Sequence, residues 1–255
     1  MEPVYSSVIT LARVVFAAQG LKFSLDGADN VPRKGGAVLA INHTGYMDFT
    51  YAGLAALPSR RFVRFMAKDE VFKHRVSGPL MRGMRHIPVD REAGAASFRE
   101  AIRALKAGEI VGVFPEATIS RSFELKEFKS GTVRMAAMAG VPILPMTIWG
   151  SQRVWTKDYP KRLGRTKVPI LLRVGEPMAV GRRDDADAAA LELMRRMTEM
   201  LHISQQEYPP LNGDDLKFLP ARLGGTAPTP ERAAELDAQE AAAKAARREA
   251  KAGEH

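Results

Sequence analysis

The sequence predicts a single α/β domain with a mainly parallel central sheet flanked by helices, plus an amphipathic helix at the amino terminus. The chain has 255 residues, 45% of them hydrophobic and 26% charged. This composition fits one folded domain and excludes a wholly disordered or fibrous protein. Along the chain, short apolar runs alternate with segments of helical periodicity. Because this alternation is typical of parallel sheets covered by helices, it predicts the fold class.

Five short apolar runs bounded by turn residues are predicted as buried strands. They are residues 37–41, 62–66, 109–114, 141–145 and 168–174. Helical spacing of apolar residues predicts helices over residues 95–105, residues 131–139 and a segment that includes Leu191 and Leu201. The first two end before Gly108 and Gly140, and glycine is favoured directly after a helix.

Residues 3–21 carry a single charge, Arg13. A membrane-spanning helix is disfavoured, because an arginine at its centre costs about 2.5–3.5 kcal/mol. A signal peptide is disfavoured because Glu2 replaces the usual positive start. At 100° per residue, one face collects the apolar residues Val4, Val8, Leu11, Val15 and Ala18. Such a helix is expected either to lie in a membrane interface or to pack on the protein's own core.

The chain is expected to have three parts. Residues 1–25 form the amino-terminal helix, residues 26–225 the α/β domain, and residues 226–255 a carboxy-terminal segment. That last segment has a helix start at Thr229-Pro230-Glu231 but only one large apolar residue, Leu236. Without an apolar face it is expected to be a solvated helix or a frayed tail, and no function is assigned to it.

The charge balance indicates anionic partners. The chain has 38 Lys and Arg against 29 Asp and Glu, a net charge of +9. Residues 60–91 and residues 153–173 hold this excess, with nine bases against three acids and seven bases against one. The two basic blocks fit phosphate esters, lipid head groups or nucleic acid, or are simply solvated surfaces. Because the chain has no cysteine, a disulfide scaffold, a cysteine nucleophile and a thiolate metal site are excluded.

Two segments that directly follow predicted strands are candidates for the functional site, residues 42–48 and residues 115–121. Ligands of parallel α/β sheets bind beyond the carboxyl ends of the strands. In the first segment, His43 and Asp48 are five residues apart, and Gly45 allows a tight turn between them. The carboxylate is expected to fix one imidazole nitrogen and leave the other free to take a proton. The alternative is that His43 caps a helix or makes only a local hydrogen bond.

The string Asn42-His43-x4-Asp48 resembles the first motif of the PlsC-type glycerolipid acyltransferases, which include 1-acylglycerol-3-phosphate acyltransferase. Four further segments resemble family elements in the same order, together covering about residues 35–150. They are residues 66–70, residues 87–91 with Arg91 at the basic position, residues 114–118 and residues 141–145. The third motif departs from the family's Pro-Glu-Gly-Thr-Arg-Ser, because Ala117 replaces glycine and Ile119 replaces arginine.

The resemblance implies transfer of a fatty acyl group from a thioester to a glycerolipid hydroxyl. His43 would be the general base and Asp48 its partner. The other residues that the resemblance assigns to substrate binding are Lys68, Arg91, Glu116, Thr118 and Arg121. Lys68 and Arg91 resemble the family's phosphate contacts. Glu116 would hold the glycerol hydroxyl or organise Thr118, unless it only caps a helix, and Arg121 would reach the anion in place of Ile119.

The expected acceptor is lysophosphatidate, and the expected product is phosphatidate, in phospholipid biosynthesis. The donor would be acyl-CoA or acyl-carrier protein as a co-substrate, with no cofactor and no metal. Both lipids imply that the amino-terminal helix docks on the cytoplasmic face of the cell membrane, as a peripheral or monotopic protein. The alternative acceptors are glycerol-3-phosphate, another lysophospholipid or a glycolipid. A non-catalytic module binding membranes or nucleic acid is disfavoured, because the basic blocks lack nucleic-acid motifs and have few aromatics, so no nucleic-acid partner is expected.

Overall fold

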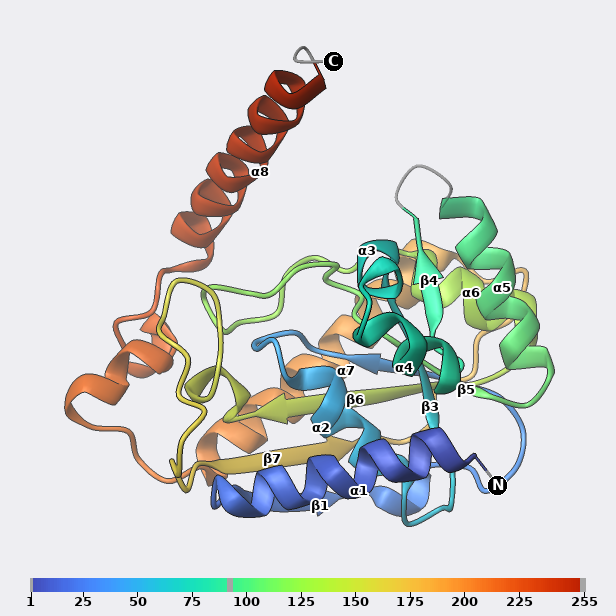
Figure 1. Cartoon of the computed structure of the whole chain (residues 1–255), viewed down its shortest axis with the longest axis horizontal. Helices are drawn as coiled ribbons and strands as arrows, with labels where there is room; N and C mark the ends of the chain where they lie inside the picture. Colours follow the sequence, from blue (N-terminus) through green and yellow to red (C-terminus); the bar gives the residue numbers. More distant parts are fainter. Residues whose placement is uncertain (1, 91–93, 253–255) are drawn as a thin grey trace.

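The computed structural model describes residues 2–90 and 94–252, and it contains a seven-stranded sheet (Figure 1). The strands are β1 (Lys22–Asp26), β2 (Ala37–Ile41), β3 (Val63–Lys68), β4 (Ile87–Val89), β5 (Ile110–Val113), β6 (Ile143–Trp149) and β7 (Pro169–Val174). Their order is β1-β7-β6-β2-β5-β3-β4. All neighbouring pairs are parallel except β6 and β7, which are antiparallel. The predicted α/β class with a mainly parallel sheet is confirmed.

Helices cover both faces of the sheet. They are α1 (Pro3–Ala18), α2 (Asp48–Ala52), α3 (Asp69–Lys73), α4 (Ser77–Gly83), α5 (Gly94–Lys106), α6 (Gly131–Ala139), α7 (Ala186–Glu207) and α8 (Pro230–Ala252). Alternate residues of β2 point to opposite cores, as the pleat of a strand requires. Leu39 and Ile41 pack with residues of α1 and α2, whereas Val38 and Ala40 pack with residues of α5, α6 and α7. The sheet is therefore the middle of three layers.

The sequence prediction misses two strands, β1 and β4, and both lie at edges of the sheet. In β1, exposed and half-buried residues alternate without a continuous apolar run, and β4 has only three residues. Strand β6 extends beyond the predicted run of residues 141–145, so Pro145 lies inside it. The Pro145 carbonyl accepts a hydrogen bond from Gly175, just where the pairing with β7 ends. The missing N–H of the proline therefore affects only the end of that ladder.

Helix α1 packs on the core and also presents an apolar surface outward. The Tyr5 hydroxyl donates to the Val63 carbonyl at 2.7 Å, and Phe16 packs against Tyr51. Leu11 and Val14, on the other side, are 64% and 61% exposed. The helix ends at Ala18, and the remainder of the predicted segment 1–25 leads into and begins strand β1. In the described part of the chain, no helix has the length and hydrophobicity needed to cross a bilayer.

Helix α8 contacts the body of the protein only near its beginning and then extends away from it (Figure 1). Ala233 is buried, and Leu236, Asp237 and Glu240 are half-buried. The expectation that this segment has nothing to bury is wrong for this stretch, because the contact rests on charged side chains rather than on an apolar face.

Candidate active site

The residues that resemble family motifs gather at one edge of the sheet. Strands β2, β5, β3 and β4 are neighbours and run parallel, so their carboxyl ends meet at this edge. His43 follows β2, Glu116 follows β5, and Lys68 ends β3. Lys68 is exposed at the junction with α3. Arg91, the predicted contact after β4, lies outside the described residues.

His43 and Asp48 form the pair that the spacing predicts. The imidazole Nδ1 of His43 lies 2.9 Å from Asp48 Oδ2. The histidine side chain is 20% exposed, whereas the Asp48 side chain is fully buried. The ring stacks on Phe114 with centroids 4.2 Å apart, which sets its plane. Since Asp48 engages Nδ1, Nε2 is the nitrogen available to take a proton.

Asp48 is held by donors from three further residues. The backbone N–H groups of Thr44 and Gly45 both donate to Oδ2 at 2.8 Å. The Ser151 hydroxyl donates to Oδ1, and its oxygen lies 3.1 Å from the Thr44 hydroxyl oxygen. These contacts occupy the carboxylate on all sides and fix its orientation toward His43. The sequence prediction missed Ser151, which lies 103 positions from Asp48.

Gly45 is required for space rather than for the turn conformation that the sequence predicts. Its φ is not among the positive values of this chain. A Cβ at this position would lie 3.0 Å from both Ser151 Oγ and the Trp155 carbonyl oxygen. We call residues 43–48 the catalytic turn. The absence of a side chain at Gly45 thus allows this turn to pack closely against the segment after β6.

Glu116 joins the two loops of the site. Its Oε1 accepts the backbone N–H of His43 at 2.8 Å, and its Oε2 accepts that of Lys126 at 3.1 Å. Burial raises the pKa of Glu116 to about 8, and these hydrogen bonds and the nearby Lys126 charge oppose the shift only in part. The contact of Glu116 with a glycerol hydroxyl stays a prediction. In the structure, Glu116 connects the backbone of His43 with the backbone of Lys126.

The loop after Glu116, which departs from the family motif in sequence, contains a residue in a left-handed conformation. Ala117 has φ +61°, a left-handed conformation that glycine adopts without strain. Ile119, at the position of the family's arginine, is buried. Thr118 is half-buried, and its hydroxyl accepts a hydrogen bond from Lys126 Nζ. Lys126 therefore places a positive charge beside Thr118, in the loop where Ile119 replaces the arginine of the family motif.

Arg121 is surrounded by carboxylates. It is 8% exposed, and its guanidinium pairs with Asp158 at 2.5 Å, with Glu240 at 2.9 Å and with Asp237. Asp237 and Glu240 belong to α8. The residue that the sequence predicts to bind the anion of the substrate is thus bound to internal anions in this structure.

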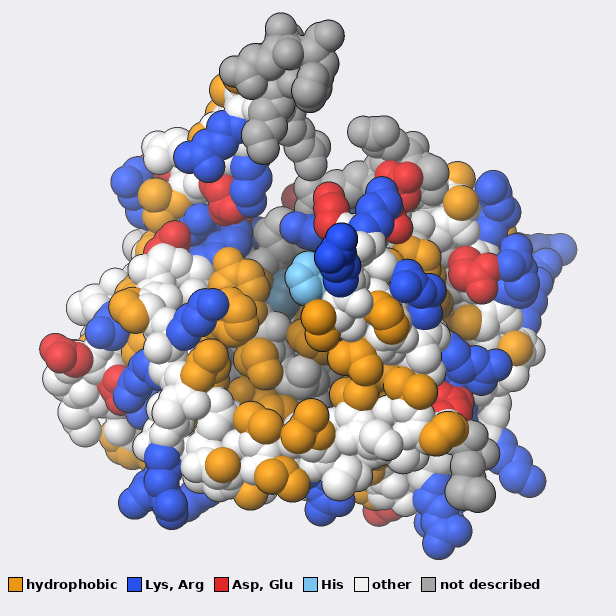
Figure 2. All heavy atoms as spheres, viewed as in Figure 1, with side chains coloured by type: hydrophobic (Ala, Val, Ile, Leu, Met, Phe, Trp, Pro, Cys, Tyr) orange, Lys and Arg blue, Asp and Glu red, His pale blue; other side chains and the backbone are white. Residues whose placement is uncertain are grey.

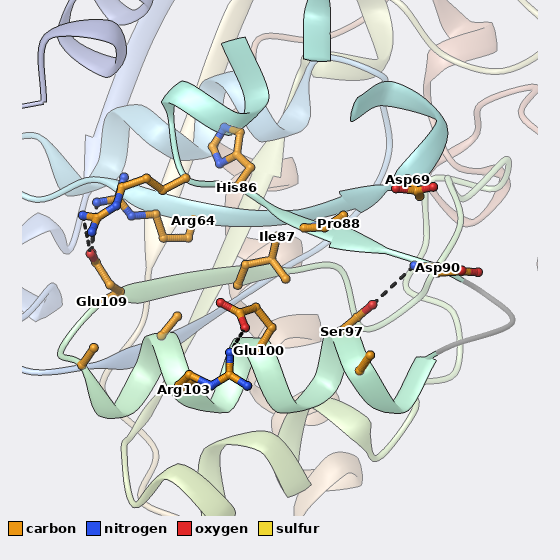
Figure 3. A pocket seen from close by; sticks show the side chains of 14 residues that line it. Arg64, Asp69, His86, Ile87, Pro88, Asp90, Ser97, Glu100, Arg103 and Glu109 are labelled. Atoms are coloured by element: carbon orange, nitrogen blue, oxygen red, sulfur yellow. Dashed lines mark hydrogen bonds and ion pairs between the residues drawn. The ribbon is translucent and has the colours of Figure 1, made fainter. Parts of the chain in front are cut away.

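A cavity lies away from the histidine–aspartate pair, in the groove between β4 and α5 (Figure 3). It measures about 750 Å³, and His43 is not among its lining residues. Among its charged side chains, Arg64 pairs with Glu109 and Arg103 pairs with Glu100. Among the described residues, no three His, Asp or Glu side chains are grouped to hold a metal ion. The residues on which the candidate chemistry rests are His43 and Asp48.

Comparison with known proteins shows the family of the chain. A family model described as acyltransferase matches residues 22–149, from β1 to the end of β6. The match includes His43, Asp48 and the loop after β5. The chain belongs to the acyltransferase family and is an O-acyltransferase.

The relatives of the chain include two proteins that are named 1-acyl-sn-glycerol-3-phosphate acyltransferase. The chain is 34% identical over 196 residues to 1-acyl-sn-glycerol-3-phosphate acyltransferase of Bacillus subtilis (strain 168), covering 73% of this chain and 92% of that one. It is 30% identical over 145 residues to the protein of the same name from Borreliella burgdorferi, covering 54% and 56%. The crystal structure of the 1-acyl-sn-glycerophosphate acyltransferase PlsC from Thermotoga maritima has the same fold, with a TM-score of 0.66 at 20% identity over 80% of this chain and 81% of that one.

Proposed function

We propose that this protein transfers a fatty acyl group from a thioester to the free hydroxyl of lysophosphatidate and so forms phosphatidate. The observation that carries the proposal is the His43–Asp48 pair, with 2.9 Å between Nδ1 and Oδ2 at the carboxyl edge of the sheet. The names of the Bacillus and Borreliella relatives support the choice of acceptor. The donor is acyl-CoA or acyl-carrier protein.

The reaction is a direct transfer. Nε2 of His43 accepts the proton of the acceptor hydroxyl as its oxygen attacks the thioester carbonyl. The buried Asp48 carboxylate stabilises the imidazolium through Nδ1. When the carbon–sulfur bond breaks, the imidazolium returns the proton to the departing thiolate, and the new ester stays on the acceptor. The ionic state of His43 is thereby restored for the next turnover.

The protein acts at a membrane surface in this proposal, as a peripheral or monotopic protein on the cytoplasmic face. Figure 2 shows hydrophobic side chains gathered over α1, with Lys and Arg side chains around them. Leu11, Val14 and Val15 of α1 are exposed, and so are Tyr46 and Phe49, which lie in and just after the catalytic turn. An apolar surface that includes the turn, surrounded by bases, suits binding to anionic lipid. The acceptor would then enter from the bilayer.

A different acceptor is the second candidate, and the buried Ile119 is the observation that favours it. Without an arginine at that position, the chain lacks one phosphate contact of the family motif. The same chemistry would serve glycerol-3-phosphate, another lysophospholipid or a glycolipid.

An acceptor panel tests the proposal. Labelled acyl-CoA and acyl-carrier protein are offered with each acceptor to the wild type, to His43→Ala and to a control, His74→Ala, which changes an exposed histidine. We expect turnover of lysophosphatidate by the wild type and the control, and a loss of at least about 100-fold in His43→Ala, the scale of a positioned general base. Turnover of another acceptor alone would reject lysophosphatidate, and near-normal activity of His43→Ala would reject the mechanism.

A further inference from the structure

Three cations of the body of the protein converge on two carboxylates of α8. Lys126 Nζ lies 2.6 Å from Asp237 Oδ2, and Lys157 Nζ lies 3.0 Å from Asp237 Oδ1. Lys157 also lies 3.1 Å from Glu240 Oε2, and Arg121 pairs with both carboxylates. We call Arg121, Lys126 and Lys157 the cation cluster. They come from two separate loops, which follow β5 and β6.

The loop that bears Arg121 and Lys126 is joined to the backbone of His43 by hydrogen bonds. The backbone N–H of Ser120, the residue before Arg121, donates to the His43 carbonyl at 2.8 Å. The backbone N–H of Lys126 donates to Glu116, whose other oxygen accepts the His43 N–H. Two backbone connections therefore link the loop bearing Arg121 and Lys126 to the catalytic turn. A ligand group held by the cluster would therefore bind to a loop that is hydrogen-bonded to the backbone of His43.

The charge of the cluster matches a phosphate monoester. The three cations face one acid of the body, Asp158, so three positive charges minus one leave +2. Asp237 and Glu240 supply two negative charges that oppose it, and Glu240 also pairs with Lys244 of the same helix. A phosphate monoester carries close to the same charge at neutral pH and offers three acceptor oxygens to arginine and lysine donors. The two carboxylates of α8 thus occupy the position in which a phosphate monoester would bind.

Helix α8 is held there by few other contacts. On this helix, Ala233 is buried, and residues 241–247 are exposed. Asp237 and Glu240 remain 21% and 30% exposed, and ion pairs in contact with solvent contribute only about 1 kcal/mol or less each. A ligand with the same charge and better geometry can therefore displace the helix.

We propose that the cation cluster binds a phosphate monoester group of a substrate, and that α8 covers this site as an internal competitor. The source of the phosphate rests on the proposed function, because lysophosphatidate and CoA both carry such a group. Binding of the phosphate replaces the carboxylates of α8 and releases the helix from the cluster. Lys126 and Lys157 thereby supply the charge that Ile119 leaves absent from the motif.

Kinetics of a variant that lacks the two carboxylates of α8 test the competition. Asp237→Asn/Glu240→Gln removes the competing charges, and the control Glu231→Gln/Glu235→Gln removes as many from the exposed side of α8. We expect the first variant to lower the KM for one phosphate-bearing substrate about 3- to 5-fold with kcat unchanged, and the control to match the wild type. A lower KM for lysophosphatidate assigns the site to its head group, and a lower KM for acyl-CoA assigns it to the donor. An unchanged KM for both would overturn the proposal.

A binding measurement separates this proposal from the proposed function. Because the chain has no cysteine, Ala242→Cys on the exposed part of α8 gives a single position for a spin label. We expect inorganic phosphate to increase the mobility of the label more than sodium chloride of equal ionic strength, and Lys157→Ala to abolish the difference. Equal effects of the two salts on the otherwise unchanged protein would overturn the phosphate site. This outcome is independent of acyl transfer.

Discussion

At the scale of single residues, the orientation of the His43 ring depends on how Asp48 is held. Backbone groups of the catalytic turn fix one carboxylate oxygen, and Ser151 from beyond β6 donates to the other. The turn alone thus positions half of the carboxylate, and a distant segment positions the rest. Ser151 is a positioning residue, since it contacts Asp48 and reaches His43 only through it.

Removal of the Ser151 hydroxyl should slow the chemical step. In Ser151→Ala, Oδ1 of the buried Asp48 loses its donor, so the carboxylate can turn and the imidazole is held less firmly. We expect kcat to fall about tenfold with KM for the acceptor unchanged. The downfield NMR resonance of the His43 Nδ1 proton should shift or broaden. An unchanged resonance with unchanged kcat would mean that Ser151 serves only packing.

The strained backbone at Ala117 makes a separate prediction. Because the residue is exposed at φ +61°, Ala117→Gly relieves a left-handed conformation that costs about 1–2 kcal/mol for residues other than glycine. The greater freedom of glycine in the unfolded chain offsets part of the gain. We expect the free energy of unfolding to rise by about 0.5–1 kcal/mol in denaturant titrations. Ala117→Val, with a branched side chain, should lower it instead.

At the scale of elements, α1 has two apolar sides, one packed on the protein and one exposed. Tyr5 and Phe16 attach it to the sheet, and Glu2 pairs with the buried Arg64 near its start. Leu11 and Val14 face outward. If the proposed membrane binding holds, a helix attached so firmly carries the whole domain to the lipid.

Loss of the outward side chains of α1 should weaken membrane binding without affecting the fold. Leu11→Ser/Val14→Ser removes apolar surface that is exposed to solvent in the protein. In the proposed membrane binding, this surface would be buried against lipid. We expect partitioning to phosphatidylethanolamine–phosphatidylglycerol vesicles to fall at least about tenfold, with the melting temperature unchanged. Leu191→Ser, at an equally exposed leucine of α7, is the control. Equal binding of both variants and the wild type would show that α1 does not contact the membrane.

At the scale of the whole molecule, two buried titratable groups oppose each other in the dependence of stability on pH. Burial raises the pKa of Glu116 to about 8, and burial together with the nearby Arg64 charge lowers the pKa of His86 to about 4. The folded protein keeps the Glu116 proton above pH 4.5, where the unfolded chain releases it, so this term lowers stability as pH rises. The His86 term lowers stability as pH falls from 6.5 to about 4.

Between pH 6.5 and about 8, only Glu116 of these two groups should change the stability. We expect the wild type to lose about 2 kcal/mol of unfolding free energy across this interval, at about 1.4 kcal/mol per pH unit. Glu116→Gln cannot ionise, so its stability should stay flat there. Denaturant titrations at several pH values measure both. Parallel curves for the two proteins would show that Glu116 is ionised throughout.

The sequence predicts the catalytic pair because His43 and Asp48 are close in the chain and directly follow a continuous apolar strand. Ser151 carries no such signal, since it is a common residue and meets Asp48 only through the folding of β6 beside β2. The sequence also gives no signal for the contact of α8 with the body of the protein. This contact is made by Asp237 and Glu240, and hydrophobic periodicity does not detect charged side chains. Strand β1 is missed because its pairing with β7 depends on residues far along the chain.

That last pairing also determines when the sheet can be completed during synthesis. Lys22 pairs with Pro169, and β7 is the only neighbour of β1 in the sheet. At about 5–20 residues per second, the ribosome needs ~7–30 s to add the intervening chain. Until then the first strand has no partner, and the helix before it is without part of its packing surface. A nascent chain in this state displays more apolar surface than the finished enzyme, which favours contact with lipid or a chaperone before release.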